Sequence, residues 1–173
     1  MNTISSSHYY ERQKLSNIKR YISWLFILFV VIASFIQSQT LTGKVIAVTD
    51  GDTIVLLVET QQYKIRLNGI DCPEKKQAFG SQAKQFTSER VYGQSVRAVV
   101  KDKDRYGRLV CDIYLPNGEK LNEEIVRNGF AWHYKKYSKD KKLAGLEIQA
   151  RNNRLGLWSD PNPIPPWEYR VYK

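Results

Sequence analysis

The sequence of 173 residues has little histidine and little cysteine, with two of each. His8, His133, Cys72 and Cys111 lie far apart and no C-x-x-C pattern occurs, so the sequence excludes an ordinary zinc site. Two cysteines are compatible with one disulfide in an oxidising compartment and equally with two free thiols. The redox state of the cysteines is therefore left open.

Acidic residues are also scarce, because 17 of them stand against 27 lysines and arginines, a formal net charge of +10. Residues 1–39 contain four basic residues and one acidic residue, so the rest of the chain keeps 23 against 16, or +7. The positive charge thus belongs to the predicted folded part. Such a surplus favours polyanionic partners, with nucleic acid first and an anionic membrane surface second.

Long apolar runs are limited to the N-terminal region, where Tyr21 to Ile36 follows basic residues and precedes small and polar ones. This run is shorter than the roughly 20 residues that a membrane-spanning helix needs, and the layout is that of a secretory signal. Residues 1–39 are predicted to be a signal peptide, cleaved near Ser38 or Gln39, on an exported protein that is secreted or periplasmic. The alternative is an uncleaved membrane anchor formed by residues 21–36.

Beyond this segment the chain is predicted to be α+β and mainly β, with three strands, a helix, two strands and then two further helices. Asp50-Gly51 is a tight-hairpin signal between the first two strands, and Ser81 and Asn122 are expected to cap helices. The expected elements span residues 43–49, 53–59, 62–68, 81–93, 95–101, 108–115, 122–129 and 140–156.

That order of elements fits the five-stranded Greek-key barrel called the OB-fold, here with about three helices. The usual ligands of this barrel are oligonucleotides and oligosaccharides. Residues 40–160 are expected to form the domain, and residues 161–173 a proline-rich C-terminal tail that runs extended along the surface.

Charged residues occur at the ends of the predicted strands. Asp71 and Glu74 follow the third strand in the stretch GIDCPE, in which Pro73 keeps the loop extended. Arg66 and Arg108 fall on the polar faces of their strands and should project away from the core.

A cluster of Asp52, Asp71 and Glu74 would offer hard oxygen ligands suited to Ca²⁺ or Mg²⁺. Two arginines facing that cluster would bind a phosphodiester. Each piece alone has a structural explanation, since Asp50-Gly51-Asp52 is most often a bare hairpin and does not match the EF-hand pattern.

Five motifs in this sequence resemble those of the thermonuclease family typified by staphylococcal nuclease. The resemblance covers about residues 43–159 and implies an OB-fold phosphodiesterase that uses Ca²⁺ and cleaves DNA and RNA with little sequence preference. The motifs are DGDT (50–53), RLNGIDCPE (66–74), DRYGRL (104–109), LNEEIVRNGFA (121–131) and GLW (156–158).

The resemblance also implies roles for six residues. Glu74 resembles the family's general base, or the group that orients the attacking water. Arg66 and Arg108 resemble the two phosphate-binding arginines. The calcium ligands implied are Asp52, Asp71 and the backbone carbonyl of Cys72.

The sequence differs from the best-known family member in three places. Cys72 replaces a threonine, which should leave a main-chain ligand intact. The segment KKQAFG after Glu74 is shorter, so contacts made by that loop do not transfer. The aromatic pair that flanks the nucleotide does not align, and Tyr134 and Tyr137 are candidates for stacking on a base. His133 is expected to be structural.

Two other functions compete with the nuclease hypothesis. The first is a nucleic-acid-binding OB-fold module without catalysis, and the second is a membrane-tethered basic protein that binds a partner. A complete acidic and arginine set favours the nuclease, which is expected to act as a monomer on DNA or RNA.

Overall fold

The computed structural model describes residues 18–26 and 39–171, and the chain divides into two compact units, 1–38 and 39–173. In the first unit, residues 18–26 are helical. The predicted apolar run, residues 21–36, lies largely outside the described residues, and the predicted cleavage position lies at their edge, near residue 39. Both stay predictions. Within the described ranges, no helix combines the length and the apolar character that crossing a membrane requires.

The second unit is built on a closed five-stranded barrel with strand order β1-β2-β3-β6-β5. Neighbouring strands are antiparallel, except that β3 and β6 pair in parallel. This architecture confirms the OB-fold prediction. The barrel strands are β1 (Thr40–Asp50), β2 (Thr53–Val58), β3 (Gln61–Leu67), β5 (Ser95–Lys103) and β6 (Leu109–Tyr114).

The barrel closes around side chains that alternate along each strand. Ile54, Leu56, Ile65 and Ile113 are fully buried in the interior, as the period of two in a strand predicts. Irregular register within β1, after Val45 and again before Asp50, bends the strand, which lets one strand pair with both β2 and β5.

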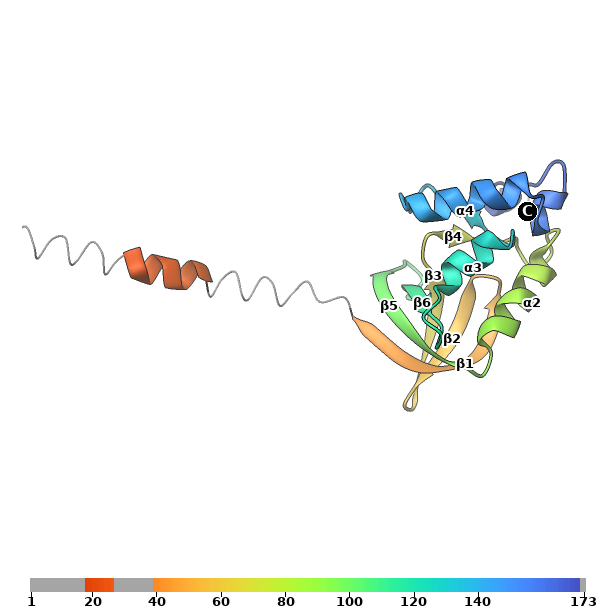
Figure 1. Cartoon of the computed structure of the whole chain (residues 1–173). Coiled ribbons are helices and arrows are strands. Elements are labelled where there is room, and N and C mark those ends of the chain that lie inside the picture. The colour runs from red at the N-terminus through yellow and green to blue at the C-terminus, as the bar shows by residue number, and fades with distance from the viewer. Residues whose placement is uncertain (1–17, 27–38, 172–173) are drawn as a thin grey trace, which may run out of the picture. The chain divides into compact units, whose positions relative to one another are not determined.

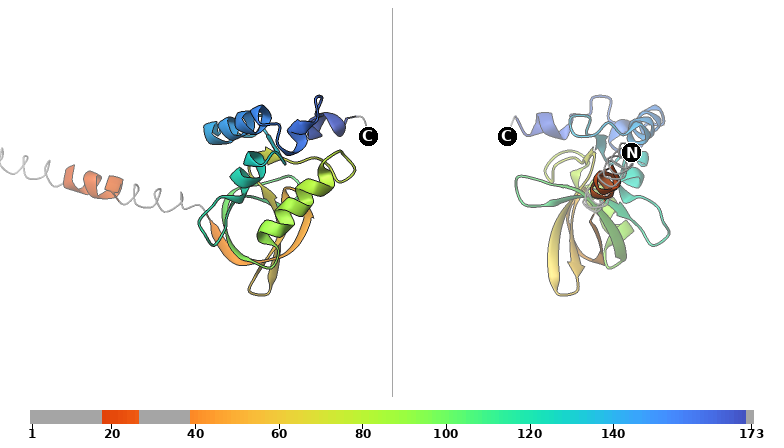
Figure 2. Two further views of the ribbon diagram at one scale, coloured as in Figure 1. Left: turned by 45° about the vertical axis from the view of Figure 1, so that its right-hand side comes forward. Right: turned by 90° about the vertical axis from the view of Figure 1, so that its left-hand side faces the viewer.

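Helices cover the outside of the barrel. In Figures 1 and 2, α2 runs beside the barrel, whereas α4 and the C-terminal residues lie together at one end of it. A two-stranded sheet of β4 and β7 lies at that end as well. The remaining elements are β4 (Ile70–Asp71), α2 (Gly80–Val91), α3 (Leu121–Arg127), β7 (Trp132–His133), α4 (Lys141–Asn152), the 3-10 turn η1 (Gly156–Ser159) and α5 (Pro166–Tyr169).

Two of the expected helix caps are wrong. Phe79, with a φ of 64°, precedes α2, so Ser81 lies inside the first turn and caps nothing. Asn122 is inside α3 and fully buried, where it accepts from the Ile113 N–H (3.0 Å) and donates to two backbone carbonyls. Asn122 therefore joins α3 to the barrel.

The hairpin between β1 and β2 differs from the expectation by one residue. Asp50 pairs with Thr53, so the turn residues are Gly51 and Asp52. A Cβ on Gly51 would lie 2.8 Å from the Cβ and Sγ atoms of Cys72. Glycine is required here because the turn packs directly against the Cys72 side chain, and this close packing helps to hold Asp52 at the end of β3.

Both cysteines are free thiols, buried in the same apolar core. Burial raises the pKa of the Cys111 thiol to about 12. His133 is also buried and lies 3.0 Å from the Ser138 hydroxyl, and burial lowers the pKa of its imidazole. A buried, hydrogen-bonded histidine of this kind agrees with a structural role.

The C-terminal residues differ from the expected extended tail. Prolines keep part of the segment extended, but residues 166–169 form α5. Trp158 is buried and packs edge-on against Trp132 with 4.4 Å between ring centroids. The segment beyond it returns to the end of the barrel that carries β4.

Candidate active site

The candidate site begins with the Asp52 carboxylate, which is held inward by the β1–β2 turn. Its Oδ2 atom accepts from the Cys72 N–H (2.8 Å), and its Oδ1 atom accepts from the Thr53 hydroxyl (3.2 Å). The backbone carbonyl of Asp52 accepts from the Leu67 N–H (2.8 Å). The turn, the end of β3 and the loop after β4 therefore fix this carboxylate together.

Arg66, on the face of β3 directed away from the barrel interior, forms an ion pair with the Asp52 carboxylate through Nη1. Its Nη2 atom lies 2.7 Å from Asp71 Oδ1 and donates to the Ile70 carbonyl at 3.1 Å. One guanidinium thus bridges two carboxylates, and its side chain is only 15 % exposed. The prediction that Arg66 leaves the core is correct, but the group is enclosed by acidic side chains rather than solvated.

Asp71 is the second buried carboxylate, with 1 % of its surface exposed. Strand β4 supplies it, and Asp71 pairs there with Trp132 of β7. Burial raises the pKa of the Asp71 carboxyl, whereas hydrogen bonds from Arg170 and the charge of Arg66 oppose that rise. The small β4–β7 sheet thereby keeps Asp71 beside Asp52.

Glu74 lies further out, and its side chain is about one third exposed. Its Oε1 atom contacts Nη1 of Arg170 at 2.7 Å, and its backbone N–H donates to the Gln77 side chain at 3.0 Å. Glu74 does not join the other two carboxylates in a three-carboxylate cluster. Across residues 18–26 and 39–171, no group of three or more His, Cys, Asp or Glu side chains is placed to hold a metal ion.

Arg108 lies immediately before β6, but its guanidinium is held by the turn that precedes it. The Nε atom contacts Asp104 Oδ2 at 2.6 Å, and the Arg108 N–H donates to Asp104 Oδ1 at 2.9 Å. The structure thus brings Asp52, Asp71 and Arg66 together, whereas Arg108 is engaged within its own loop.

The two carboxylates of the turn, Asp50 and Asp52, influence each other's pKa values. Burial, together with the charge of Asp52, raises the pKa of the Asp50 carboxyl to about 6. Burial would also raise the pKa of Asp52, but the Arg66 guanidinium outweighs it and lowers that pKa. Two guanidinium groups, those of Arg66 and Arg170, lie near four carboxylates, those of Asp50, Asp52, Asp71 and Glu74.

This donor set fits a hard divalent cation. The oxygens of Asp52 and Asp71 already converge on one cationic group, the Arg66 guanidinium, and both carboxylates are buried. The pair leaves no soft ligand aimed at that position, because the Cys72 thiol is buried with a pKa raised well above its usual value by burial. Carboxylate oxygens of this kind suit Ca²⁺ or Mg²⁺.

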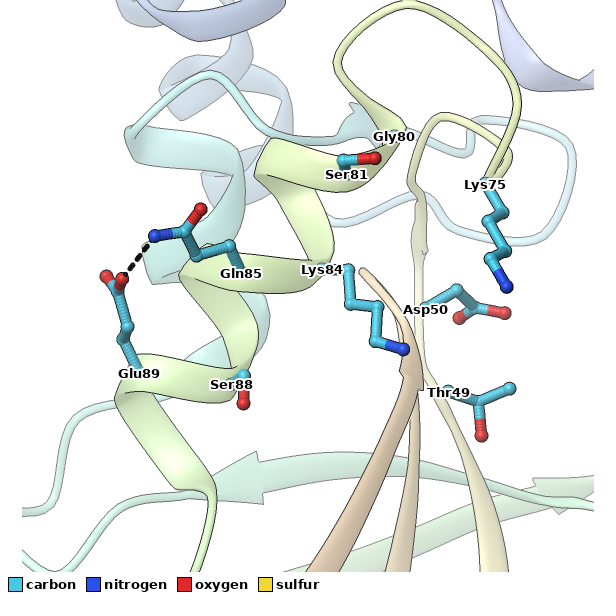
Figure 3. Close-up of a pocket in the computed structure, with 9 residues that line it drawn as sticks. All are labelled: Thr49, Asp50, Lys75, Gly80, Ser81, Lys84, Gln85, Ser88 and Glu89. Carbon is cyan, nitrogen blue, oxygen red and sulfur yellow. Dashed lines mark hydrogen bonds between the residues drawn. The ribbon is translucent and has the colours of Figure 1, made fainter.

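A pocket of about 320 Å³ adjoins the turn on the side of α2. Figure 3 shows the amino groups of Lys75 and Lys84 pointing toward the end of β1, where Thr49 and Asp50 lie. Ser81 at the start of α2 lines the same pocket. The pocket therefore places two cationic groups beside the Asp50 carboxylate.

Arg170 is the site residue that sequence reasoning missed. It contacts Asp71 and Glu74, although it lies 99 residues after Asp71 and 96 residues after Glu74 in the sequence. No local pattern signals such a contact, because α5 is short and lies in a segment whose prolines indicate only an extended tail.

Comparison with known proteins agrees with this geometry. The family model described as staphylococcal nuclease homologue matches residues 64–160. A protein of Escherichia coli O157:H7 named uncharacterized endonuclease is 41% identical over 131 residues, which is 76% of this chain and 86% of that protein. A protein of Shigella flexneri named micrococcal nuclease is 40% identical over 151 residues, covering 82% and 87%. An uncharacterized endonuclease of Haemophilus influenzae is 37% identical over 155 residues, covering 89% and 86%.

The fold and these similarities define the class of protein as a nuclease, an enzyme that hydrolyses nucleic acid. The chain belongs to the staphylococcal nuclease homologue family. The family resemblance inferred from the motifs is confirmed, and the non-catalytic alternatives are not favoured.

Proposed function

We propose that this nuclease hydrolyses phosphodiester bonds of DNA and RNA with little sequence preference, and that it depends on Ca²⁺. The observation that carries the proposal is the convergence of two buried carboxylates, Asp52 and Asp71, on one position at the end of β3. The Arg66 guanidinium bridges the two carboxylates at that position, and Glu74 lies nearby, paired with Arg170. Two buried carboxylates that can share one metal ion are what a metal-dependent phosphodiesterase would require.

Asp52, Asp71 and the backbone carbonyl of Cys72 are the proposed ligands of the cation. When bound, Ca²⁺ supplies a Lewis acid for a phosphoryl oxygen. The hydrogen bonds from Cys72 and Thr53 hold the Asp52 carboxylate in place before any metal arrives, so little reorganisation is needed at that ligand.

Arg66 and Arg108 are the proposed phosphate-binding groups. A guanidinium presents paired N–H donors that match two phosphate oxygens, and it opposes charge that grows in the transition state. Arg66 would exchange its bond to Asp71 for a phosphate oxygen. Arg108 would turn from Asp104, whose pKa burial would raise but hydrogen bonds from Arg108 hold low.

Glu74 is the proposed general base, or the group that orients the attacking water. Its partly exposed carboxylate lies beside Asp71 through the shared partner Arg170. A carboxylate in hydrogen-bond reach of a water can accept its proton as the oxygen attacks phosphorus.

The substrate strand is proposed to cross the lysine-lined pocket beside Asp50 and the aromatic residues that follow β7. Lys75 and Lys84 would contact backbone phosphates, which carry no sequence information. Tyr137, 69 % exposed, is available to stack on a base. Low sequence preference follows, because phosphate contacts and stacking are common to all nucleotides.

The test is cleavage of single-stranded DNA by the purified protein with Ca²⁺ and with excess chelator. We expect cleavage only with Ca²⁺, and a drop of orders of magnitude in turnover for Asp71→Asn. Lys101→Gln, which removes a partly exposed barrel charge, serves as the control and should cleave normally. Absence of cleavage in both conditions would reject the proposed function.

We further propose that residues 1–39 direct export and are removed, with an uncleaved anchor as the alternative. Intact-mass measurement of the protein produced in a bacterial host decides between them. A mass lower by the first 38 or 39 residues supports export with cleavage, and an unchanged mass supports the anchor.

A further inference from the structure

Residues 161–171, called the C-terminal segment below, dock on the candidate active site. Trp167 stacks on Tyr134 with 5.3 Å between ring centroids and 3° between planes, and meets Trp132 edge-on at 5.5 Å. Aromatic contacts of this kind bury large apolar areas and fix ring positions. They place α5 beside β7, whose partner strand β4 carries Asp71.

Two hydrogen bonds join the same segment to the loop after Glu74. The Gln77 side chain donates to the Ile164 carbonyl at 2.6 Å, and the Tyr169 hydroxyl donates to the Lys76 carbonyl at 3.2 Å. Gln77 also accepts from the Glu74 N–H. The loop that carries the proposed base is therefore tied to the C-terminal segment.

This docking brings the Arg170 side chain into contact with Asp71 and Glu74. Its Nη2 atom lies 2.7 Å from Asp71 Oδ2, and its Nη1 atom lies 2.7 Å from Glu74 Oε1. Because Arg66 holds Asp71 Oδ1, both oxygens of Asp71 are bonded to guanidinium groups. A cation that binds Asp71 must therefore displace or compete with at least one arginine.

Arg170 is the arginine more easily displaced. Its side chain is 41 % exposed, against 15 % for Arg66. The backbone of Arg66 is fixed in the barrel wall by strand pairing with Thr53 and Val110. Arg170 follows a helix of only four residues near the end of the chain, and short terminal segments of this kind open at low free-energy cost.

We propose that the C-terminal segment is a latch in which Arg170, paired with Asp71 and Glu74, competes with a cation for Asp71 and is released when a divalent cation binds. This inference rests on the proposed function, because it assumes the cation site at Asp52 and Asp71. By linkage, the latch weakens cation binding by the same factor by which the cation weakens the latch. It also keeps Asp71 and Glu74 paired while no cation is present.

The first test is calorimetric titration of the full chain with Ca²⁺. Arg170→Gln should bind Ca²⁺ about three- to tenfold more tightly than the natural chain, the equivalent of two partly exposed ion pairs. Arg97→Gln is the matched control, because it removes the same charge from an exposed position on β5 that lies over the Tyr114 ring. Its affinity should be unchanged.

Trp167→Ala separates a latch from a purely local charge effect. This variant keeps every charge at the site but loses the ring that anchors α5 to Tyr134 and Trp132. It should also bind Ca²⁺ more tightly. If Arg170→Gln tightens binding and Trp167→Ala does not, the latch is rejected in favour of a charge effect alone.

The second test follows tryptophan fluorescence during the same titration. Ca²⁺ should change the emission of the natural chain as Trp167 leaves the Tyr134 ring, and Trp167→Phe should abolish most of that change. Equal Ca²⁺ affinity of the natural chain and Arg170→Gln would overturn the latch and leave the proposed function standing. If no variant binds Ca²⁺, the proposed function fails, and the latch fails with it.

Discussion

Replacing Arg66 with methionine removes the cation that bridges Asp52 and Asp71 while keeping a long apolar stem on β3. Asp71 would keep Arg170, so the main loss falls on Asp52, whose side chain is only 7 % exposed. Breaking one side of a buried ion pair costs about 3–5 kcal/mol, because the remaining charge is left without its partner. We expect the lower end, about 3 kcal/mol, since Asp52 keeps its bonds to Cys72 and Thr53.

The assay is urea unfolding in the presence of chelator, with the free energy of unfolding compared between variants. Lys101→Met is the control, because Lys101 is 43 % exposed and lies 3.6 Å from Asp112, a pair worth less than about 1 kcal/mol. In an Asp52→Asn background, the loss caused by Arg66→Met should shrink to less than about 1 kcal/mol. A loss below about 1 kcal/mol in the natural background would refute the claim that Arg66 neutralises buried carboxylates.

Three further predictions concern other parts of the domain. Arg108→Ala should lower turnover about a hundredfold or more but change the free energy of unfolding by less than about 1 kcal/mol, as cleavage rates and urea unfolding will show. Asp50 has a pKa of about 6 when folded, against 3.8 unfolded, so the folded state binds more protons between those values and stability falls as the pH rises through them. That fall, at most about 3 kcal/mol and reduced by partial exposure, should be absent from Asp50→Asn in urea unfolding at pH 4 to 7 with chelator. Asn122→Ala should cost about 2–3 kcal/mol because the buried Ile113 N–H loses its partner, and a loss under 1 kcal/mol in urea unfolding would contradict that role.

The barrel was predictable because its signals are local. Strand alternation and the glycine at the β1–β2 turn can be recognised from residues that are adjacent in the sequence. They predicted the strands to within a few positions. The caps were less predictable. Ser81 and Asn122 have the right chemistry for caps, but tertiary contacts determine where their helices begin, and Asn122 bonds to β6 and to the Asn68 carbonyl instead.

The site was predictable in part for the same reason. Asp52 lies in the turn between β1 and β2, Arg66 near the end of β3 and Asp71 just beyond it in β4, so their meeting could be anticipated from strand order. The contact between Arg108 and Asp104 spans four residues, a spacing that could have indicated it. Arg170 could not be anticipated, because its approach depends on the stacking of Trp167 on Tyr134, a contact between distant segments.

The measurement that bears most directly on the central claim is calcium binding by the full chain and by Asp52→Asn and Asp71→Asn, made alongside cleavage of single-stranded DNA in the same samples. The account predicts one bound Ca²⁺ in the natural chain, with binding and cleavage both reduced by orders of magnitude in each variant. Undiminished binding in both variants, or full cleavage in the presence of excess chelator, would contradict a calcium site held by Asp52 and Asp71.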